Sequence, residues 1–440
     1  MIVRIATTIF ALVLISAPAR AQEAGINVTI PLVEETLRFL RNQALSIRPE
    51  AAFLRAGVIS VCGKNMERPG CRPDGVPIPK PNMIGPDATQ AWRRILESVI
   101  VTETIQQGDA FDKTAFQRFV MNGMVEALED PASFYLVPSV YRKIGSIPSG
   151  FVGFGLRVFF DEDTLRVGAV HADSPASAAG LRLGDLITKV NDQPVTGYHR
   201  PLALAAIWGA EGNNVKLEIK RAGETRDVSV AYKPWTFHAF TVEKKGDVIL
   251  VKISYFDRGL VDAVRESIAG SKKGIVIDLR GAASGNENEM VGFADLLLEK
   301  GSIGSKKTRL DLGNRTWKAE AGSRGERTDL ATAVIIDSST SGLAEVLVSA
   351  LRKNTRAILI GQETSGEDTQ ETMRTFRDGS AIQITSTQLF GPSETPLSAG
   401  IKPHLKTDRS HPDDLAVSIV KKAAGPSMDD LLDAGREAVK

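Results

Sequence analysis

The sequence lacks the residue patterns that indicate a metal site, a nucleic-acid site or a membrane span. Its five histidines are scattered singly along 440 residues, and no two have the spacing of metal ligands, so we expect no metal and no cofactor. The formal net charge is only +1, and no basic block favours nucleic acid as a partner. Beyond the N-terminus, no apolar run approaches the length of a membrane span.

Cysteine is almost absent as well. Only Cys62 and Cys71 occur, close together in a loop that also contains proline and glycine. In an exported chain these two residues are expected to form one disulfide. Two unpaired thiols are the alternative that the sequence leaves open.

The one concentrated apolar stretch lies at the N-terminus and has the pattern of a targeting segment. Arg4 is the charged flank, Ile5 to Ile15 is apolar, and Ala19 to Ala21 is a small-x-small cleavage site. We therefore expect residues 1–21 to be a signal peptide and the mature chain to begin at Gln22. The expected location is the periplasm or cell envelope, with no integral membrane span after cleavage. An uncleaved anchor is the less favoured alternative.

The length of the chain indicates about two to four domains. Residues 22–145 are expected to form a helical N-terminal region, with apolar stripes at helical spacing over 33–44, 91–102 and 116–128. This region is interpreted as an arm for homodimerisation or for docking an adaptor partner. A helical cap on the rest of the protein is equally compatible with the pattern.

Residues 146–236 contain a specific signature. Asp173 to Leu181 reads DSPASAAGL, and Gly184 to Ile187 reads GDLI. This spacing is similar to that of PDZ domains, and the resemblance covers the whole module. Gly180 suits the left-handed end of the short alanine-rich helix.

The resemblance to PDZ domains also implies a peptide-binding site. Phe154, Gly155 and Leu156 form an apolar–glycine–apolar loop that enters a strand over 156–160. In this mode of recognition, successive N–H groups of the loop capture a chain-terminal carboxylate, and the strand adds a peptide strand. The implied partners are protein C-termini or unfolded polypeptides.

The rest of the chain is organised around residues 331–370. Ala333 to Ile336 is a buried strand, 338–342 is a small polar turn, an apolar helix follows from Leu343, and Ala357 to Ile360 is a second strand. Such strand–turn–helix–strand units form parallel sheets, and the carboxyl ends of their strands carry the chemistry. The turn is therefore the first place to look for a nucleophile.

This stretch resembles the core of the S41 serine peptidases, the C-terminal (tail-specific) processing proteases. The family uses a serine nucleophile, a lysine general base, and a glutamine four residues beyond the lysine. A gapless overlay anchored on Glu345 and Gly366 places Gly342 at the nucleophile, Glu367 at the lysine and Glu371 at the glutamine. The resemblance thus implies a retained scaffold in which all three chemical positions are substituted.

The oxyanion region is substituted too. Residues 274–280, GIVIDLR, resemble the family's G-x-x-x-D-L-R-x-N-P-G-G, in which a glycine N–H helps to form the oxyanion hole. Here Ala283 replaces the proline and Ser284 the first glycine, and Gly285 follows. The backbone geometry expected at Ser284 and Gly285 is therefore in question.

Together these patterns predict an α/β fold, with an S41 peptidase-type core over 237–409, an inserted PDZ domain and C-terminal helices over 410–440. The favoured function is an exported family member that binds protein C-termini or unfolded peptides as an adaptor or regulator, without the catalytic pair. One alternative is an active serine endopeptidase with a rearranged nucleophile such as Ser341. Another is a structural partner in an envelope complex.

Overall fold

The computed structural model describes two compact units. The residues described are 31–144, 154–161, 164–171, 173–197, 207, 214–231, 235–271, 273–311, 313–320, 327–407 and 412–439. One unit comprises the chain up to Arg142 together with Glu371–Ser386, and the other comprises Lys143–Gln370 with Thr387–Lys440. The expected signal peptide, residues 1–21, lies outside the described residues.

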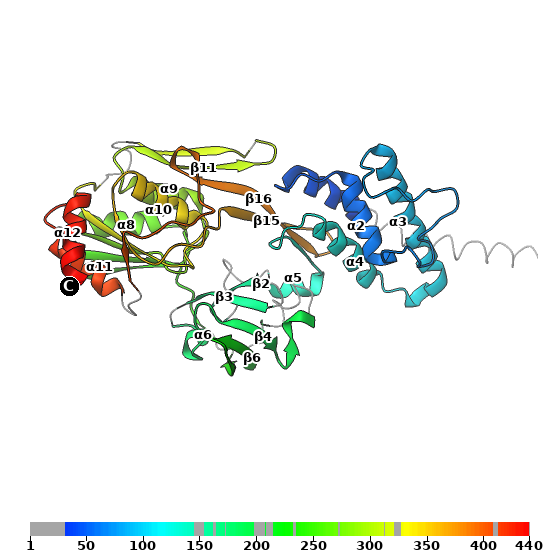
Figure 1. The fold of residues 1–440 in the computed structure, drawn as a ribbon, viewed down its shortest axis with the longest axis horizontal. Coiled ribbons are helices and arrows are strands. Elements are labelled where there is room, and N and C mark those ends of the chain that lie inside the picture. The colour runs from blue at the N-terminus through cyan, green and yellow to red at the C-terminus, as the bar shows by residue number, and fades with distance from the viewer. Residues whose placement is uncertain are drawn as a thin grey trace, which may run out of the picture. The chain divides into compact units, whose positions relative to one another are not determined.

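The first unit is built mainly from helices (Figure 1, blue to cyan). They span residues 31–43, α2 (Glu50–Cys62), α3 (Pro86–Gln107) and α4 (Lys113–Glu126). Their buried side chains form one apolar core. In the described part of the chain, no helix is both long and apolar enough to cross a membrane.

The two cysteines lie at the end of α2 and in the loop that follows it. Cys62 and Cys71 form a disulfide with a Cα–Cα distance of 5.9 Å, and both residues are buried. The loop that they enclose packs closely on α3, because a Cβ at Gly70 would lie 2.7 Å from Thr102 Oγ1. The disulfide predicted from the sequence is therefore confirmed.

Residues 371–386 were expected to belong to the α/β core, yet they pack with the helices of the first unit. They include most of β15 (Thr369–Thr375) and the beginning of β16 (Ala381–Gly391). Strand β1 (Phe134–Leu136) pairs antiparallel with residues 381–383 of β16. Ile382 and Ile384 on this strand are fully buried in the apolar core of the helices, which explains why the segment joins that unit.

The second unit contains the PDZ-like module, a small antiparallel sheet of order β2-β3-β4-β6-β7, with β5 paired to β4. Its elements are β2 (Leu156–Asp161), β3 (Thr164–Val170), α6 (Pro175–Ala178), β4 (Leu186–Val190), β5 (Gln193–Pro194), β6 (Asn214–Arg221) and β7 (Glu224–Ala231). Gly180 has a φ of 80°, as the end of the short helix requires. A bulge interrupts the β2–β3 ladder between Arg157 and Val158.

The same unit contains a mainly parallel sheet of order β18-β14-β13-β10-β9-β8, in which β8 is an antiparallel edge. The strands are β8 (Phe240–Lys245), β9 (Val248–Ile253), β10 (Gly274–Asp278), β13 (Ala331–Ile336), β14 (Ile358–Gly361) and β18 (Leu405–Lys406). Alternate strand residues face two separate apolar clusters. Helices α8 (Leu260–Ala269), α9 (Glu287–Asp295) and α10 (Leu343–Lys353) cover one face, and α11 (Pro412–Lys422) and α12 (Met428–Val439) cover the other (Figure 1).

Helix α9 begins at Glu287, directly after Asn286. The Asn286 side chain accepts a hydrogen bond from the Asn288 N–H at 2.9 Å, which caps the helix at this point. Gly301 begins the hairpin β11 (Gly301–Thr308) and β12 (Arg315–Ala319). Strand β11 pairs with residues 387–390 of β16.

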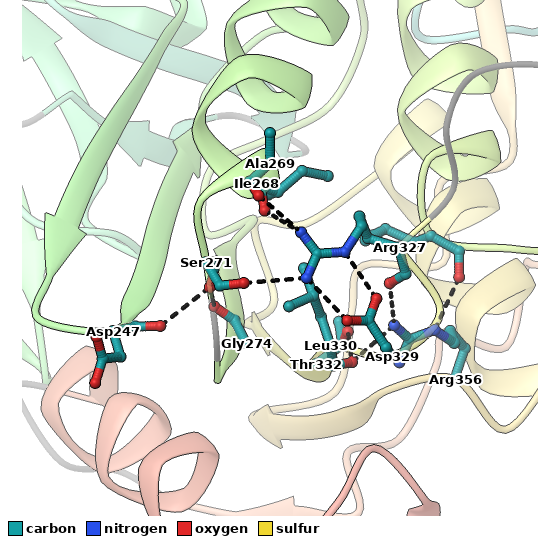
Figure 2. Close-up of polar contacts among 11 residues, drawn as sticks. Asp247, Ile268, Ala269, Ser271, Gly274, Arg327, Asp329, Leu330, Thr332 and Arg356 are labelled. Atoms are coloured by element: carbon teal, nitrogen blue, oxygen red, sulfur yellow. Dashed lines mark hydrogen bonds and ion pairs between the residues drawn. The ribbon is translucent and has the colours of Figure 1, made fainter.

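A cluster of Arg327, Asp329 and Arg356 joins the ends of several core elements (Figure 2). Arg327 donates to the carbonyl oxygens of Ile268 and Ala269, at the C-terminus of α8, and forms an ion pair with Asp329 at 2.7 Å. A cation at this end of a helix is stabilising because the last carbonyl groups have no partner within the helix. The cluster therefore fixes where α8 ends.

Candidate active site

The turn between β13 and α10 lies where the sequence analysis expected the chemistry, at the carboxyl end of a central parallel strand. Gly342 is the N-cap of α10, with φ 55° and ψ −124°. Side chains rarely adopt this left-handed conformation, so the residue type matches the backbone. A sharp strand-to-helix turn of this kind is also where hydrolases of other folds present a nucleophilic serine.

The surroundings of Gly342 do not accommodate a side chain. A Cβ at this position would lie 2.9 Å from the carbonyl oxygen of Ala283, which is closer than real Cβ contacts. The Gly342 N–H donates to the carbonyl oxygen of Glu367 at 2.9 Å. At the family's nucleophile position the nearby loop therefore presents a hydrogen-bond acceptor, and the local N–H group is already used.

The hydroxyl groups of the turn mostly satisfy the turn itself. Ser339 Oγ accepts from the Gly281 N–H at 2.7 Å and donates to Asp337. Thr340 Oγ1 donates to the carbonyl oxygen of Leu279 at 2.9 Å. Local bonds of this kind are the ordinary use of serine and threonine at turns and helix starts.

Ser341, the alternative nucleophile, is in an unfavourable place for attack. Its side chain is enclosed, with 1% of the residue exposed, and its N–H donates to the Ala282 carbonyl oxygen at 2.9 Å. Within the described ranges, no group forms a hydrogen bond with Ser341 Oγ. A serine needs an adjacent base to become nucleophilic, and none is in contact here.

At the lysine position, Glu367 faces a cation from the PDZ-like module. Arg157 on β2 is 8% exposed and donates from Nη2 to the carbonyl oxygen of Ser339 at 2.5 Å. Burial lowers the pKa of Arg157, and the charges of Glu367 and Asp337 act in the opposite direction. The position that the overlay assigns to the lysine therefore holds a carboxylate, and its charge acts on the guanidinium of Arg157.

Sequence reasoning missed Arg157. The only signal was a charged residue within the otherwise apolar strand 156–160, which by itself indicates no role. Arg157, Arg166, Ser338 and Glu367 line a cavity of about 400 Å³ beside the turn. A bulge follows Arg157 in the β2–β3 ladder. Bulges next to functional sites often change the direction of a side chain.

Glu345 holds the loop that carries Glu367 against α10. Its carboxylate is fully buried, and Oε1 accepts from Thr364 Oγ1 and from the Gly366 N–H at 2.8 Å. Burial raises the pKa of Glu345 to about 7, and the hydrogen bonds from the loop oppose that increase. Thr364 Oγ1 in turn accepts from the Ile401 N–H, so the loop is fixed on two sides.

Glu371, at the family's glutamine position, lies on β15 and is exposed. It belongs to the first compact unit, whereas Gly342 and Glu367 belong to the second.

The expected oxyanion loop is held in place by Phe256. The Phe256 N–H donates to the Ser284 carbonyl oxygen at 3.2 Å, and the Phe256 carbonyl accepts from the Asn286 N–H at 2.6 Å. Gly285 has a φ of 147°, and a Cβ there would lie 2.5 Å from Phe256 backbone atoms. Ser284 itself is exposed.

The loop of the PDZ-like module is tightly packed. Phe154, Gly155 and Leu156 are all buried. The Gly155 carbonyl accepts from the His171 N–H at 2.9 Å, and a Cβ at Gly155 would lie 2.2 Å from Ser174 Cβ. The loop therefore requires glycine at this position.

Among the residues that the structure describes, no group of three or more histidine, cysteine, aspartate or glutamate side chains could hold a metal ion.

Comparisons with known proteins agree with this architecture. A family model of Peptidase family S41 matches residues 247–407, and a PDZ domain model matches residues 166–221. The chain is 29% identical over 305 residues to a probable CtpA-like serine protease of Staphylococcus aureus (strain N315), covering 68% of this chain and 61% of that protein. It is 28% identical over 314 residues to the carboxy-terminal processing protease CtpA of Bacillus subtilis (strain 168), covering 69% of this chain and 66% of that protein.

The chain therefore spans 61–66% of the length of these two relatives. Among solved structures it is similar to a photosystem II D1 C-terminal processing protease, with a TM-score of 0.58 at 21% identity, covering 76% of this chain and 92% of that one. At this identity the likeness shows the fold. The domain matches show that the chain contains a Peptidase family S41 domain over residues 247–407 and a PDZ domain over residues 166–221.

Proposed function

We propose that this protein binds polypeptide chains without cleaving them, as an adaptor or regulator. The observation that carries the proposal is the environment of Gly342, where the Ala283 carbonyl oxygen stands 2.9 Å from the position of a Cβ. Acyl transfer needs a nucleophile with a base, and N–H donors at the developing oxyanion. The site supplies no side chain at the nucleophile position and a carboxylate, Glu367, at the base position.

The PDZ domain supports the binding half of the proposal. Its loop Phe154–Leu156 precedes strand β2, and such a loop and strand suit the capture of an extended peptide with a free C-terminus. The ligand proposed is the end of an unfolded polypeptide with an apolar last residue. The helical N-terminal region is proposed to dock a partner or a second copy.

The test follows binding and cleavage of the same labelled peptides. Peptides with a free, apolar C-terminus are expected to bind and to remain intact over long incubation, and amidation of that terminus is expected to weaken binding. Without nucleophile and base, a serine protease retains roughly 10³–10⁴-fold acceleration over water, far below ordinary turnover. A photoreactive group near the peptide end is expected to cross-link to residues 154–161.

A fluorophosphonate probe, which labels nucleophilic serines, tests independently whether the protein has an active serine. No labelling of the wild-type protein is expected, while an active serine protease in the same tube is labelled. Hydrolysis that survives purification and disappears in Ser341→Ala would show that the nucleophile has moved, and the proposal would be wrong. Equal binding of free-acid and amidated peptides would contradict the proposed capture of a free C-terminus, but not the proposed lack of cleavage.

Export is proposed from the N-terminal sequence. Cleavage after Ala21 would give a mature chain that begins at Gln22, in a compartment where the disulfide between Cys62 and Cys71 is favoured. Mass spectrometry of the native protein is expected to find Gln22 at the N-terminus. A native chain that retains Met1 would contradict cleavage.

A further inference from the structure

A polar cleft of about 500 Å³ lies at the carboxyl ends of β9, β10 and β13, next to the PDZ domain. We call it the strand-end cleft. The core contributes Thr241, Lys252 and Arg280, and the PDZ domain contributes apolar side chains that include Val170 and Leu183. Crevices at the carboxyl ends of parallel strands are the usual ligand sites of α/β sheets.

Three polar residues of the cleft are direct neighbours across the sheet. Lys252 on β9 is in register with Thr241 on β8 and with Asp278 on β10. Residues in register project from the same face of a sheet, with Cβ atoms about 5 Å apart. Lys252 continues the row of Val248 and Leu250, whose side chains are buried in the cluster that includes α11. The row therefore changes from apolar to cationic where it enters the cleft.

The carboxylates of the core wall already have partners of their own. Asp278 forms a two-pronged ion pair with Arg280, at 2.9 and 2.6 Å. Glu243 is paired with Lys245 at 2.8 Å. Asp337 accepts hydrogen bonds from the backbone and hydroxyl groups of the turn that follows it. None of these carboxylates forms an ion pair with Lys252 in the described structure.

Two donors, by contrast, are not engaged. Thr241 Oγ1 is enclosed and forms no hydrogen bond with any described residue. Lys252 is half-buried, and its ammonium group has neither an ion pair nor a hydrogen bond among the residues that the structure places. Lys252 interacts favourably with the charge of Glu243, but the Glu243 carboxylate forms its ion pair with Lys245. An enclosed hydroxyl and a half-buried ammonium side by side are matched by an anionic hydrogen-bond acceptor.

We propose that the strand-end cleft binds a carboxylate, held by Lys252 Nζ and Thr241 Oγ1, with an apolar substituent of the ligand against Val170 and Leu183. The cleft borders the turn through Asp337 and Ser339, but its lining includes neither Gly342 nor the loop Phe154–Leu156. The proposal stands whether or not that loop binds a peptide. The carboxylate has two possible sources, the C-terminus of a polypeptide or a small free acid. Both present the same group to Lys252.

The test uses the full mature chain and three probes: 4-methylpentanoate, an acetylated tetrapeptide ending in leucine, and the same peptide amidated. Under saturating carboxylate, modification of Lys252 by an amine-reactive ester is expected to slow about tenfold, as mass spectrometry would show. Lys189, which is paired with Glu218 on the PDZ sheet, is the internal control and should react at an unchanged rate. This measurement needs no variant.

Calorimetry of variants provides the second arm. Loss of a charge-assisted hydrogen bond is expected to weaken carboxylate binding about tenfold or more in Lys252→Met, and more moderately in Thr241→Val. Lys252→Arg should retain most of the affinity, and the matched charge-loss variant Lys189→Met should retain all of it. If Lys252→Met fails to fold, protection of Lys252 in the wild-type protein decides the question.

Protection of Lys252 and the affinity of Lys252→Met separate this site from peptide capture by the PDZ loop. Binding of both acids, but not of the amide, supports a general carboxylate site, and binding of the peptide acid alone identifies a chain end. Equal binding of the amide, no protection of Lys252, or unchanged affinity in Lys252→Met overturns the proposal. Cross-links at residues 154–161 without protection of Lys252 would leave the proposed function intact and remove this site.

Discussion

Replacing Arg356 by methionine is expected to lower the free energy of unfolding of the second unit by about 3–5 kcal/mol, a loss typical of breaking a buried charged network. Arg356 Nε donates to the Leu297 carbonyl oxygen at 2.8 Å, and Nη2 donates to those of Arg327 and Leu330 at 2.9 and 2.7 Å (Figure 2). Methionine fills much of the volume but removes three hydrogen bonds. The Arg327 and Leu330 carbonyls then keep only longer bonds, from the Leu330 N–H at 3.4 Å and from Thr332 Oγ1 at 3.2 Å.

Burial lowers the pKa of Arg356 to about 10, so the guanidinium stays charged at neutral pH and its hydrogen bonds are charge-assisted. Arg352→Met is the matched control. Arg352 lies on the last turn of α10 and donates from Nη1 to the Lys402 carbonyl oxygen at 2.6 Å from an exposed position. Its loss is expected to cost less than about 1 kcal/mol. Urea unfolding followed by circular dichroism compares the two, and equal small losses would contradict the role given to Arg356.

Much of the α/β core follows from local patterns. Val248 to Val251 is a continuous apolar run, and β9 extends it through Lys252 to Ile253. Both faces of the strand are buried over the apolar part. The apolar stripe after Gly342 predicted α10. Helix α2 was not singled out within the helical region, although Leu54, Val58 and Val61 recur at helical spacing and are buried.

For the candidate site, the sequence could predict which residue types occupy the positions, but not which groups surround them. The overlay on the family predicts substitutions at Gly342 and Glu367, and this assignment stays a prediction. It did not show that the Ala283 carbonyl faces Gly342, since the direction of a peptide group depends on the fold of the whole loop. It also did not show Arg157, which meets Ser339 across 182 residues of sequence. Pairings at such separations come from the packing of domains and leave no periodic signal in the sequence.

The pH dependence of stability is expected to reveal the buried Glu345 carboxylate. Burial raises its pKa to about 7 from an ordinary value of 4.5, so the native state holds its proton more tightly than the unfolded chain does. The resulting stabilisation is complete below about pH 4.5 and is lost as the pH rises through about 7. A difference of this size corresponds to about 3 kcal/mol, as an order of magnitude.

Glu345→Gln removes the titration and keeps an oxygen that can accept from Thr364 and Gly366. Between pH 5 and pH 8 the wild-type protein is therefore expected to lose about 3 kcal/mol more stability than the variant does. Glu363→Gln, an exposed carboxylate of the same loop, is the matched control and should follow the wild-type profile. Urea unfolding at each pH gives the comparison. The hydrogen-exchange protection factors of residues 364–367 should also fall more in the wild type than in Glu345→Gln over the same range. Parallel pH profiles for wild type and Glu345→Gln would show that the carboxylate is already ionised at pH 5, and the loop would then owe its position to hydrogen bonds alone.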